Sequence, residues 1–229
     1  MNRAVLAQPY RAYLFDLDGT LVDSAPDICG ALNAALDAGS LPPVSEALTR
    51  HWVGHGSRVL LEQALMYHGA SGRIADEAEM ARMLRIFVDY YTAHIADRSR
   101  PYPGVVETLA ALQRRAVGLA VVTNKLAGLS QLLLEALDLR RYFGVVVGGD
   151  SLPQRKPDPA PALHALRALD ARANESLFIG DSSTDVETAR NAGCRVVCVR
   201  DGYNHGVPAD RLGADAVIVN FLELVQSAS

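Results

Sequence analysis

Four aspartates in this sequence follow apolar runs and have the spacing of a reactive site. They are Asp16, Asp18, Asp181 and Asp185. On an extended chain, residues two apart share one face, so the carboxylates of Asp16 and Asp18 can address a single reacting phosphorus atom. One of the two can attack while the other gives and takes protons. The pattern therefore predicts phosphoryl transfer with a carboxylate as the nucleophile.

The same four carboxylates predict a metal site. Gathered in one crevice of low dielectric constant, they would be costly to bury unless a cation neutralised them. Their ligand atoms are all oxygen, without His or Cys among them, which indicates a hard cation, and Mg²⁺ is the usual one where phosphate is the substrate. Beside Asp18, Gly19 permits a tight turn, and the hydroxyl of Thr20 can fix the carboxylates.

Short runs of β-branched and aliphatic residues alternate with stretches in which apolar residues recur every three or four positions. The predicted strands are 12–15, 118–122, 144–147, 176–179, 195–199 and 216–219. The predicted helices between them are 105–115, 126–137, 159–169 and 184–192. This alternation predicts a mostly parallel α/β sheet covered by helices on both faces. The aspartates stand at the carboxyl ends of strands, where ligands bind in such sheets.

The interval between the first two of these strands breaks the alternation, because it contains only helical patterns and loops with Gly and Pro. Its predicted helices are 26–38, 57–67 and 76–95. A stiff Pro-Tyr-Pro-Gly turn at 101–104 precedes the next helix. We therefore expect an all-helical cap domain inserted into an α/β core. The predicted boundaries are 26–99 for the cap, with 1–25 and 100–229 forming the catalytic core.

Composition excludes several classes of protein. Of the 229 residues, 49% are apolar and 21% are charged, an ordinary globular balance that allows a substantial core. The net charge of −4, without a basic run, argues against nucleic acid as a partner. No apolar run reaches signal-peptide or transmembrane length, and three unevenly spaced cysteines argue against a disulfide framework. We expect a cytoplasmic protein without a membrane partner, as a monomer or homodimer.

Four segments, in order along the chain, resemble the motifs of the haloacid dehalogenase superfamily. They are 15–24 (FDLDGTLVDS), 121–125 (VVTNK), 156–159 (KPDP) and 180–185 (GDSSTD). The resemblance covers nearly the whole chain and implies a Rossmann-like core with a cap. It implies that Asp16 is the nucleophile, forming an aspartyl-phosphate, and that Asp18 is the general acid and base.

The resemblance also implies the ligands of the metal and of the phosphate. Mg²⁺ would be held by Asp16, the backbone carbonyl of Asp18 and Asp181, with Asp185 in the outer coordination shell. The phosphoryl oxygens would be bound by Thr123, Asn124 and Lys156.

Segment 49–56 of the cap narrows the resemblance to bacterial phosphoglycolate phosphatases, and segments 101–105 and 202–206 of the core do the same. This similarity implies a small phosphorylated metabolite, 2-phosphoglycolate, as the substrate. Within the cap we expect His55 to approach the substrate and Arg58 to pair with its carboxylate.

Other functions stay open or are disfavoured by particular residues. A phosphatase for a sugar phosphate or a nucleotide remains the main alternative, because cap loops select the substrate. Thr20 stands where a phosphomutase of this fold often has Val, and a dehalogenase does not need Asp18. A non-catalytic module would lack a motif residue, and none is missing. Zinc at His51 and His55 is disfavoured because no carboxylate or thiolate is close in sequence.

Overall fold

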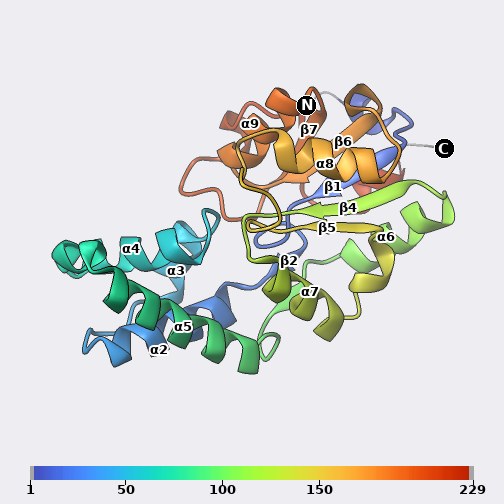
Figure 1. Cartoon of the computed structure of the whole chain (residues 1–229). Helices are drawn as coiled ribbons and strands as arrows, with labels where there is room; N and C mark the ends of the chain where they lie inside the picture. Colours follow the sequence, from blue (N-terminus) through green and yellow to red (C-terminus); the bar gives the residue numbers. More distant parts are fainter. Residues whose placement is uncertain (1–2, 227–229) are drawn as a thin grey trace.

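The computed structural model describes residues 3–226 and has an α/β sheet with a helical segment beside it (Figure 1). Six strands form the main sheet, in the spatial order β5-β4-β1-β6-β7-β8, and every neighbouring pair is parallel. The strands are β1 (Ala12–Phe15), β4 (Gly118–Val122), β5 (Val145–Val147), β6 (Ser176–Gly180), β7 (Arg195–Val199) and β8 (Ala216–Ile218). The predicted parallel α/β architecture is confirmed, and predicted strand ends differ from the observed ones by at most one residue.

The register of the central strands brings their carboxyl ends together. Phe15, the last residue of β1, lies between Val121 of β4 and Ile179 of β6. The residues that follow these three strands therefore emerge side by side at one edge of the sheet. This is the edge at which the sequence places its acidic and phosphate-binding motifs.

Helices cover both faces of the sheet because alternate strand residues point to opposite sides. On one face, Tyr13 and Phe15 pack in a core with residues of α6 (Val105–Arg114) and α7 (Ala127–Ala136). On the other face, Leu14 and Phe178 pack in a second core with α8 (Ala160–Ala168) and α9 (Ser183–Ala192). The shorter elements are the helices α1 (Arg3–Leu6) and α10 (Glu223–Gln226) and the 3-10 helices η2 (Arg140–Tyr142), η3 (Ala173–Glu175) and η4 (Ala209–Arg211).

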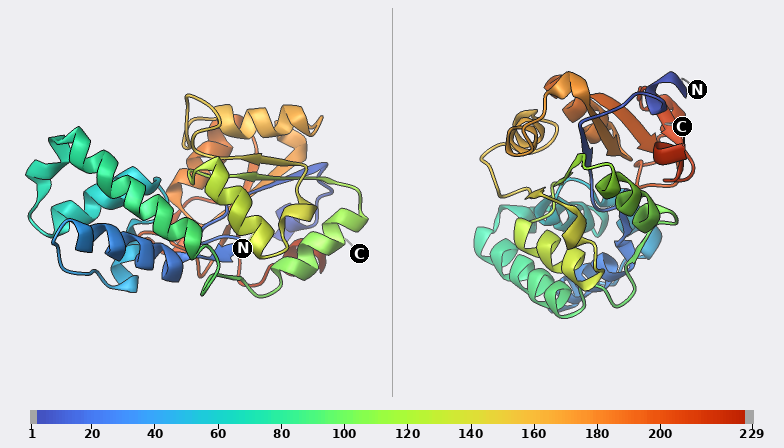
Figure 2. Two further views of the ribbon diagram at one scale, coloured as in Figure 1. Left: turned by 60° about the horizontal axis from the view of Figure 1, so that its bottom comes forward. Right: turned by 90° about the vertical axis from the view of Figure 1, so that its right-hand side faces the viewer.

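The interval between β1 and β4 folds as a bundle of helices with its own apolar core, here called the helical segment (25–93). It contains α2 (Ala25–Ala38), α3 (Glu46–Trp52), α4 (Ser57–Tyr67), η1 (Ser71–Ala75) and α5 (Glu77–Ala93). Its core includes Leu36, Leu61 and Met83, and Leu129 and Tyr203 from the sheet portion pack against it. Figure 2 shows the segment beside the sheet and not on either covered face. Its status as a separate domain stays a prediction.

A two-stranded antiparallel ribbon joins the helical segment to the sheet portion. Strand β2 (Val22–Asp23) pairs with β3 (Arg100–Pro101), so the chain enters and leaves the segment at neighbouring positions. Within residues 3–226, no helix is both long and apolar enough to cross a lipid bilayer.

Candidate active site

The loop after β1 presents two carboxylates in different directions. The backbone N–H of Asp16 donates to the carbonyl of Ile179 (2.9 Å), which continues the sheet pairing one residue beyond β1. Gly19 then turns the chain with φ of +83°, and a Cβ there would lie 2.7 Å from the ring of Tyr203. The turn therefore requires glycine.

The carboxylate of Asp16 is buried beside a buried lysine. Lys156 Nζ lies 2.8 Å from Asp16 Oδ1 and 2.7 Å from Asp185 Oδ1. Burial raises the pKa of Asp16 to about 6, although Lys156 works in the opposite direction. Burial would lower the pKa of Lys156, but Asp16 and Asp185 outweigh it and raise that pKa. The lysine thus stays charged between two carboxylates.

Asp185 is fully occupied by donors of the protein. Its Oδ2 accepts from the backbone N–H of Asp181 (3.1 Å), and from the N–H (3.1 Å) and hydroxyl (2.8 Å) of Ser182 at the start of α9. Its Oδ1 accepts from Lys156 (2.7 Å). Burial acts to raise the pKa of Asp185, but Lys156 and Ser182 outweigh it and lower that pKa.

Three buried carboxylates converge at this edge of the sheet. Asp16, Asp181 and Asp185 each offer an oxygen atom, and these oxygens lie within 4.8 Å of one another. The partners of Asp181 are neutral: Thr20 Oγ1 donates to its Oδ1 (2.7 Å) and Tyr203 N–H to its Oδ2 (2.5 Å). Burial and the charges of Asp185 and Asp16 raise the pKa of Asp181 well above its ordinary value. A cation bound there would relieve this repulsion.

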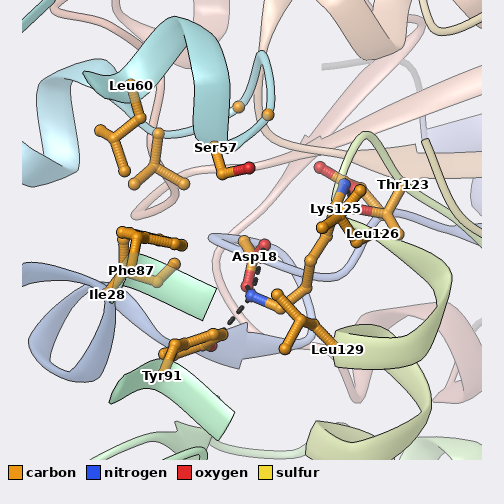
Figure 3. Close-up of a pocket in the computed structure, with 14 residues that line it drawn as sticks. Asp18, Ile28, Ser57, Leu60, Phe87, Tyr91, Thr123, Lys125, Leu126 and Leu129 are labelled. Atoms are coloured by element: carbon orange, nitrogen blue, oxygen red, sulfur yellow. Dashed lines mark hydrogen bonds and ion pairs between the residues drawn. The ribbon is translucent and has the colours of Figure 1, made fainter. Parts of the chain in front are cut away.

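Asp18 turns away from that group toward the helical segment. Its Oδ1 accepts from Ser24 Oγ (2.5 Å) and from Lys125 Nζ (3.0 Å). Lys125 Nζ also donates to the hydroxyl of Tyr91 on α5 (2.9 Å), as the dashed lines in Figure 3 show. Burial would lower the pKa of Lys125, but Asp18 and Tyr91 outweigh it and raise that pKa.

The predicted phosphate ligands lie in loops: Thr123 and Asn124 follow β4, and Lys156 precedes α8. Thr123 directly follows β4, and its N–H donates to the carbonyl of Val147 (3.0 Å). The side-chain amide of Asn124 donates to the carbonyls of Gly54 (3.0 Å) and Lys156 (3.2 Å). These bonds occupy the side-chain amide nitrogen, so the Asn124 side chain fastens the helical segment to the core. Its contact with phosphate stays a prediction.

A cavity of about 40 Å³ lies between the two portions of the chain (Figure 3). Asp16, Asp18, Thr123 and Lys125 form its polar wall. Its opposite side is mostly apolar and comes largely from the helical segment. That side contains Ile28, Val53, Leu60, Phe87, Leu126 and Leu129, with Gly54, Gly56 and Ser57 between them.

Comparison with known proteins decides the family. The model of the haloacid dehalogenase-like hydrolase family matches residues 13–199. This chain belongs to that family. It is 46% identical over 190 residues to a phosphoglycolate phosphatase of Mesorhizobium japonicum, covering 83% of this chain and 82% of that protein. It is 44% identical over 210 residues to a phosphoglycolate phosphatase of Caulobacter vibrioides, covering 92% and 87%.

A solved structure has the same fold as this hydrolase. The crystal structure of a protein described as a predicted phosphoglycolate phosphatase from Haemophilus somnus 129pt superposes with a TM-score of 0.91. It is 36% identical in sequence, and the match covers 97% of this chain and 99% of that one. Family and relatives together show that the chain is a phosphatase, a phosphoric monoester hydrolase.

The two residues of the helical segment that sequence reasoning selected behave differently in this hydrolase. Arg58 forms ion pairs with Glu62 (3.0 Å) and Glu77 (2.8 Å) and is not among the residues that line the cavity, so its pairing with a substrate carboxylate stays a prediction. The ring of His55 stacks on His205 with centroids 5.1 Å apart. Burial and His205 lower the pKa of His55, which lies between the two glycines that line the cavity.

Sequence reasoning missed Ser24 and Lys125, which bind Asp18, and Tyr91, which binds Lys125. Lys125 stands two residues after Thr123, so its place in the motif was a usable signal. Ser24 ends the first motif and offered the same kind of signal. Tyr91 had none, because only the fold of α5 against the sheet portion brings it to Lys125.

Proposed function

We propose that this phosphatase hydrolyses 2-phosphoglycolate to glycolate and phosphate, with Mg²⁺ and an aspartyl-phosphate on Asp16. The observation that carries the proposal is the placement of Asp16. Its carboxylate lines a small cavity, beside the buried cation of Lys156 and two further carboxylates. Relatives called phosphoglycolate phosphatase across most of their length support the choice of substrate.

The reaction divides into two displacements at phosphorus. First, an oxygen of Asp16 forms a bond to phosphorus, the bond to the ester oxygen breaks, and Asp18 gives its proton to the departing alkoxide. Then Asp18 takes a proton from water, the water oxygen bonds to phosphorus, and the bond to Asp16 breaks. Phosphate leaves and both aspartates return to their starting states.

Lys156 and Thr123 suit the stabilisation of charge on the transferring group. Lys156 is held in place by two carboxylates, so its positive charge is fixed before substrate arrives. Thr123 lines the cavity beside Asp16. Fixed charges and dipoles aimed at developing charge are the main source of catalysis in phosphoryl transfer.

The acidic group fits Mg²⁺ in its chemistry. All of its ligand atoms are oxygen, and Asp181 has only neutral partners, so a hard cation would meet an uncompensated carboxylate. Asp16, Asp181 and the backbone carbonyl of Asp18 would hold it, with Asp185, whose oxygens are occupied, in the outer shell. When bound, Mg²⁺ would neutralise negative charge on the phosphoryl oxygens.

The cavity supports a short substrate and a reaction shielded from bulk water. Its volume of about 40 Å³ favours a short-chain monoester over a nucleotide. The apolar wall from the helical segment keeps bulk water from Asp16 while the segment is closed. The described cysteines Cys29, Cys194 and Cys198 are free thiols, which supports the cytoplasmic location that we also propose.

The test is kcat/KM for 2-phosphoglycolate against sugar phosphates, nucleotides and other short phospho-acids, with Mg²⁺ and with a chelator. We expect 2-phosphoglycolate to lead by about 100-fold or more, or about 2.7 kcal/mol of transition-state discrimination. We also expect the chelator to remove activity. Activity that is flat across the panel, or highest for a sugar phosphate or a nucleotide, would overturn the substrate; undiminished activity in chelator would overturn the metal.

A further inference from the structure

Lys125 is a buried cation, and its position suits contact with the substrate in addition to the ion pair with Asp18. It belongs to the loop after β4, and only 6% of its side chain is exposed. Its Nζ lies 3.0 and 3.1 Å from the two oxygens of Asp18 and 2.9 Å from the hydroxyl of Tyr91. Nζ also lies 4.4 Å from the centre of the Tyr91 ring. Tyr91 and Asp18 therefore hold the ammonium from two different portions of the chain.

Among the described residues that line the cavity, Lys125 carries the only positive charge. Lys156 lies behind Asp16 and is shared by two carboxylates. Arg58 is paired with glutamates outside the cavity. A second anionic group on the substrate would thus have one cationic partner available. That partner is Lys125.

The position of Lys125 also limits how far such an anionic group can be from the ester oxygen. In the proposed reaction, Asp18 protonates that oxygen, and Lys125 Nζ lies within hydrogen-bond distance of Asp18. Beyond it the wall is apolar, with Leu126, Leu129 and Phe87 (Figure 3). These side chains offer nothing to the hydroxyls of a sugar. The arrangement therefore suits an acid group close to the ester carbon.

We propose that Lys125, positioned by Tyr91, binds the acid group of the substrate and so makes the site select short phosphate monoesters with a carboxylate near the ester oxygen. This inference rests on the proposed phosphatase function and deepens it. The ammonium of Lys125 donates hydrogen bonds to Asp18 and to Tyr91 in the structure. The carboxylate of the substrate takes the place of one of these acceptors. A charge-assisted hydrogen bond in a buried site is stronger than the same bond in water. A neutral substrate gains nothing comparable.

The experiment compares two substrates of equal length in the full chain with Mg²⁺. 2-Phosphoglycolate carries the carboxylate, and 2-hydroxyethyl phosphate carries a hydroxymethyl group in its place. We expect Lys125→Met to lower the ratio of their kcat/KM values by about 30-fold, with most of the change in KM for 2-phosphoglycolate. The Arg58→Met variant, which removes a cation that does not line the cavity, should keep the ratio of the unchanged enzyme.

Any other result overturns the role of Lys125, the proposed substrate or the proposed phosphatase function. If folded Lys125→Met loses activity equally on both substrates, or if Arg58→Met lowers the ratio instead, the role of Lys125 is wrong while the phosphatase function stands. If the unchanged enzyme hydrolyses 2-hydroxyethyl phosphate but not 2-phosphoglycolate, the proposed substrate falls and this inference with it. If it hydrolyses neither, the failure lies in the proposed function.

A further variant serves as a test if Lys125→Met does not fold. Such a failure can occur because Lys125 is buried and its loss leaves Asp18 without a cationic partner. Tyr91→Phe removes only the hydroxyl that positions the ammonium and leaves the charge and the ring. We expect it to lower the same ratio by about fivefold, the effect of one hydrogen bond. An unchanged ratio in this variant would overturn the positioning by Tyr91 and, if neither Lys125→Met nor Lys125→Gln folds, the proposal as a whole.

Discussion

Asp23 Oδ1 lies 2.6 Å from Arg50 Nη1, which ties α3 of the helical segment to the ribbon that leads into it. The second guanidinium nitrogen of Arg50 donates to Asp23 Oδ2 (2.9 Å), and the hydroxyl of Tyr203 donates to Oδ1 (2.6 Å). Tyr203 also binds Asp181 through its backbone N–H. The contact thus joins the helical segment, the ribbon and the acidic group.

We expect this contact to stabilise the protein in a pH-dependent way. Burial acts to raise the pKa of Asp23, but Arg50 and Tyr203 outweigh it and lower that pKa below 3.8. A lowered carboxyl pKa contributes stability that is present above the ordinary value and is lost as pH falls through the folded value. Asp23→Asn should therefore reduce the free energy of unfolding at pH 7, and this reduction should become smaller as the pH falls below the ordinary carboxyl pKa.

Denaturant unfolding at several pH values measures this. Asp89→Asn, which changes an exposed carboxylate of α5, provides the control and should be nearly neutral throughout. If Asp23→Asn lowers the free energy of unfolding equally at pH 3 and pH 7, the ion pair with Arg50 is not the source of the loss.

Asp16→Asn should abolish turnover, because an amide cannot form the covalent intermediate. We expect kcat to fall by about 10⁴-fold or more, with the fold retained, since Lys156 keeps its pairing with Asp185. Steady-state assays measure the loss, and mass spectrometry excludes deamidation of the new amide back to Asp. Substantial activity in the verified Asp16→Asn variant would remove Asp16 from the nucleophile role.

Asp181→Asn should separate stability from function. Burial and neighbouring carboxylates raise the pKa of Asp181, so ionised Asp181 disfavours the folded state above the ordinary carboxyl pKa. In chelator at pH 7, the variant should therefore have a higher Tm than the unchanged protein. Mg²⁺ should raise the Tm of the unchanged protein but not of the variant. An equal rise in both proteins would place the ion elsewhere.

Gly202→Ala should damage the same site by crowding. A Cβ at Gly202 would lie 2.7 Å from the carbonyl oxygen of Gly19 and 2.9 Å from Asp181 Cγ, both of which belong to tightly held parts of the site. We expect the variant to need a higher Mg²⁺ concentration for half-maximal activity. Gly128→Ala, on α7 with open space around the new methyl group, should leave that concentration unchanged.

Sequence reasoning succeeded where a local pattern is sufficient. The run from Ala12 to Phe15 is apolar throughout, so a strand buried on both faces was predictable, and with it the position of Asp16 at the end of that strand. Helices such as α4 were predictable from apolar spacing alone.

The missed elements are short or depend on distant partners. The strands β2 and β3 have two residues each, too few to show alternation, and only their mutual pairing defines them. Helix α3 is seven residues long and begins at Glu46, after the N-cap residue Ser45, whose hydroxyl accepts from the N–H of Leu48 (3.3 Å). The contact between Tyr91 and Lys125 has no local signature. The ion pairs of Arg58 with Glu62 and Glu77 were not predicted from the sequence either.

The ribbon of β2 and β3 has an evolutionary consequence. Because Val22 pairs with Pro101 and Asp23 with Arg100, the stretch between them starts and finishes at almost the same point in space. A replacement of any length or architecture that begins and ends on these residues leaves the register of the six-stranded sheet untouched. Selection can therefore exchange the segment that supplies most of the apolar wall of the cavity while the sheet edge that carries Asp16 and Asp181 is inherited unchanged.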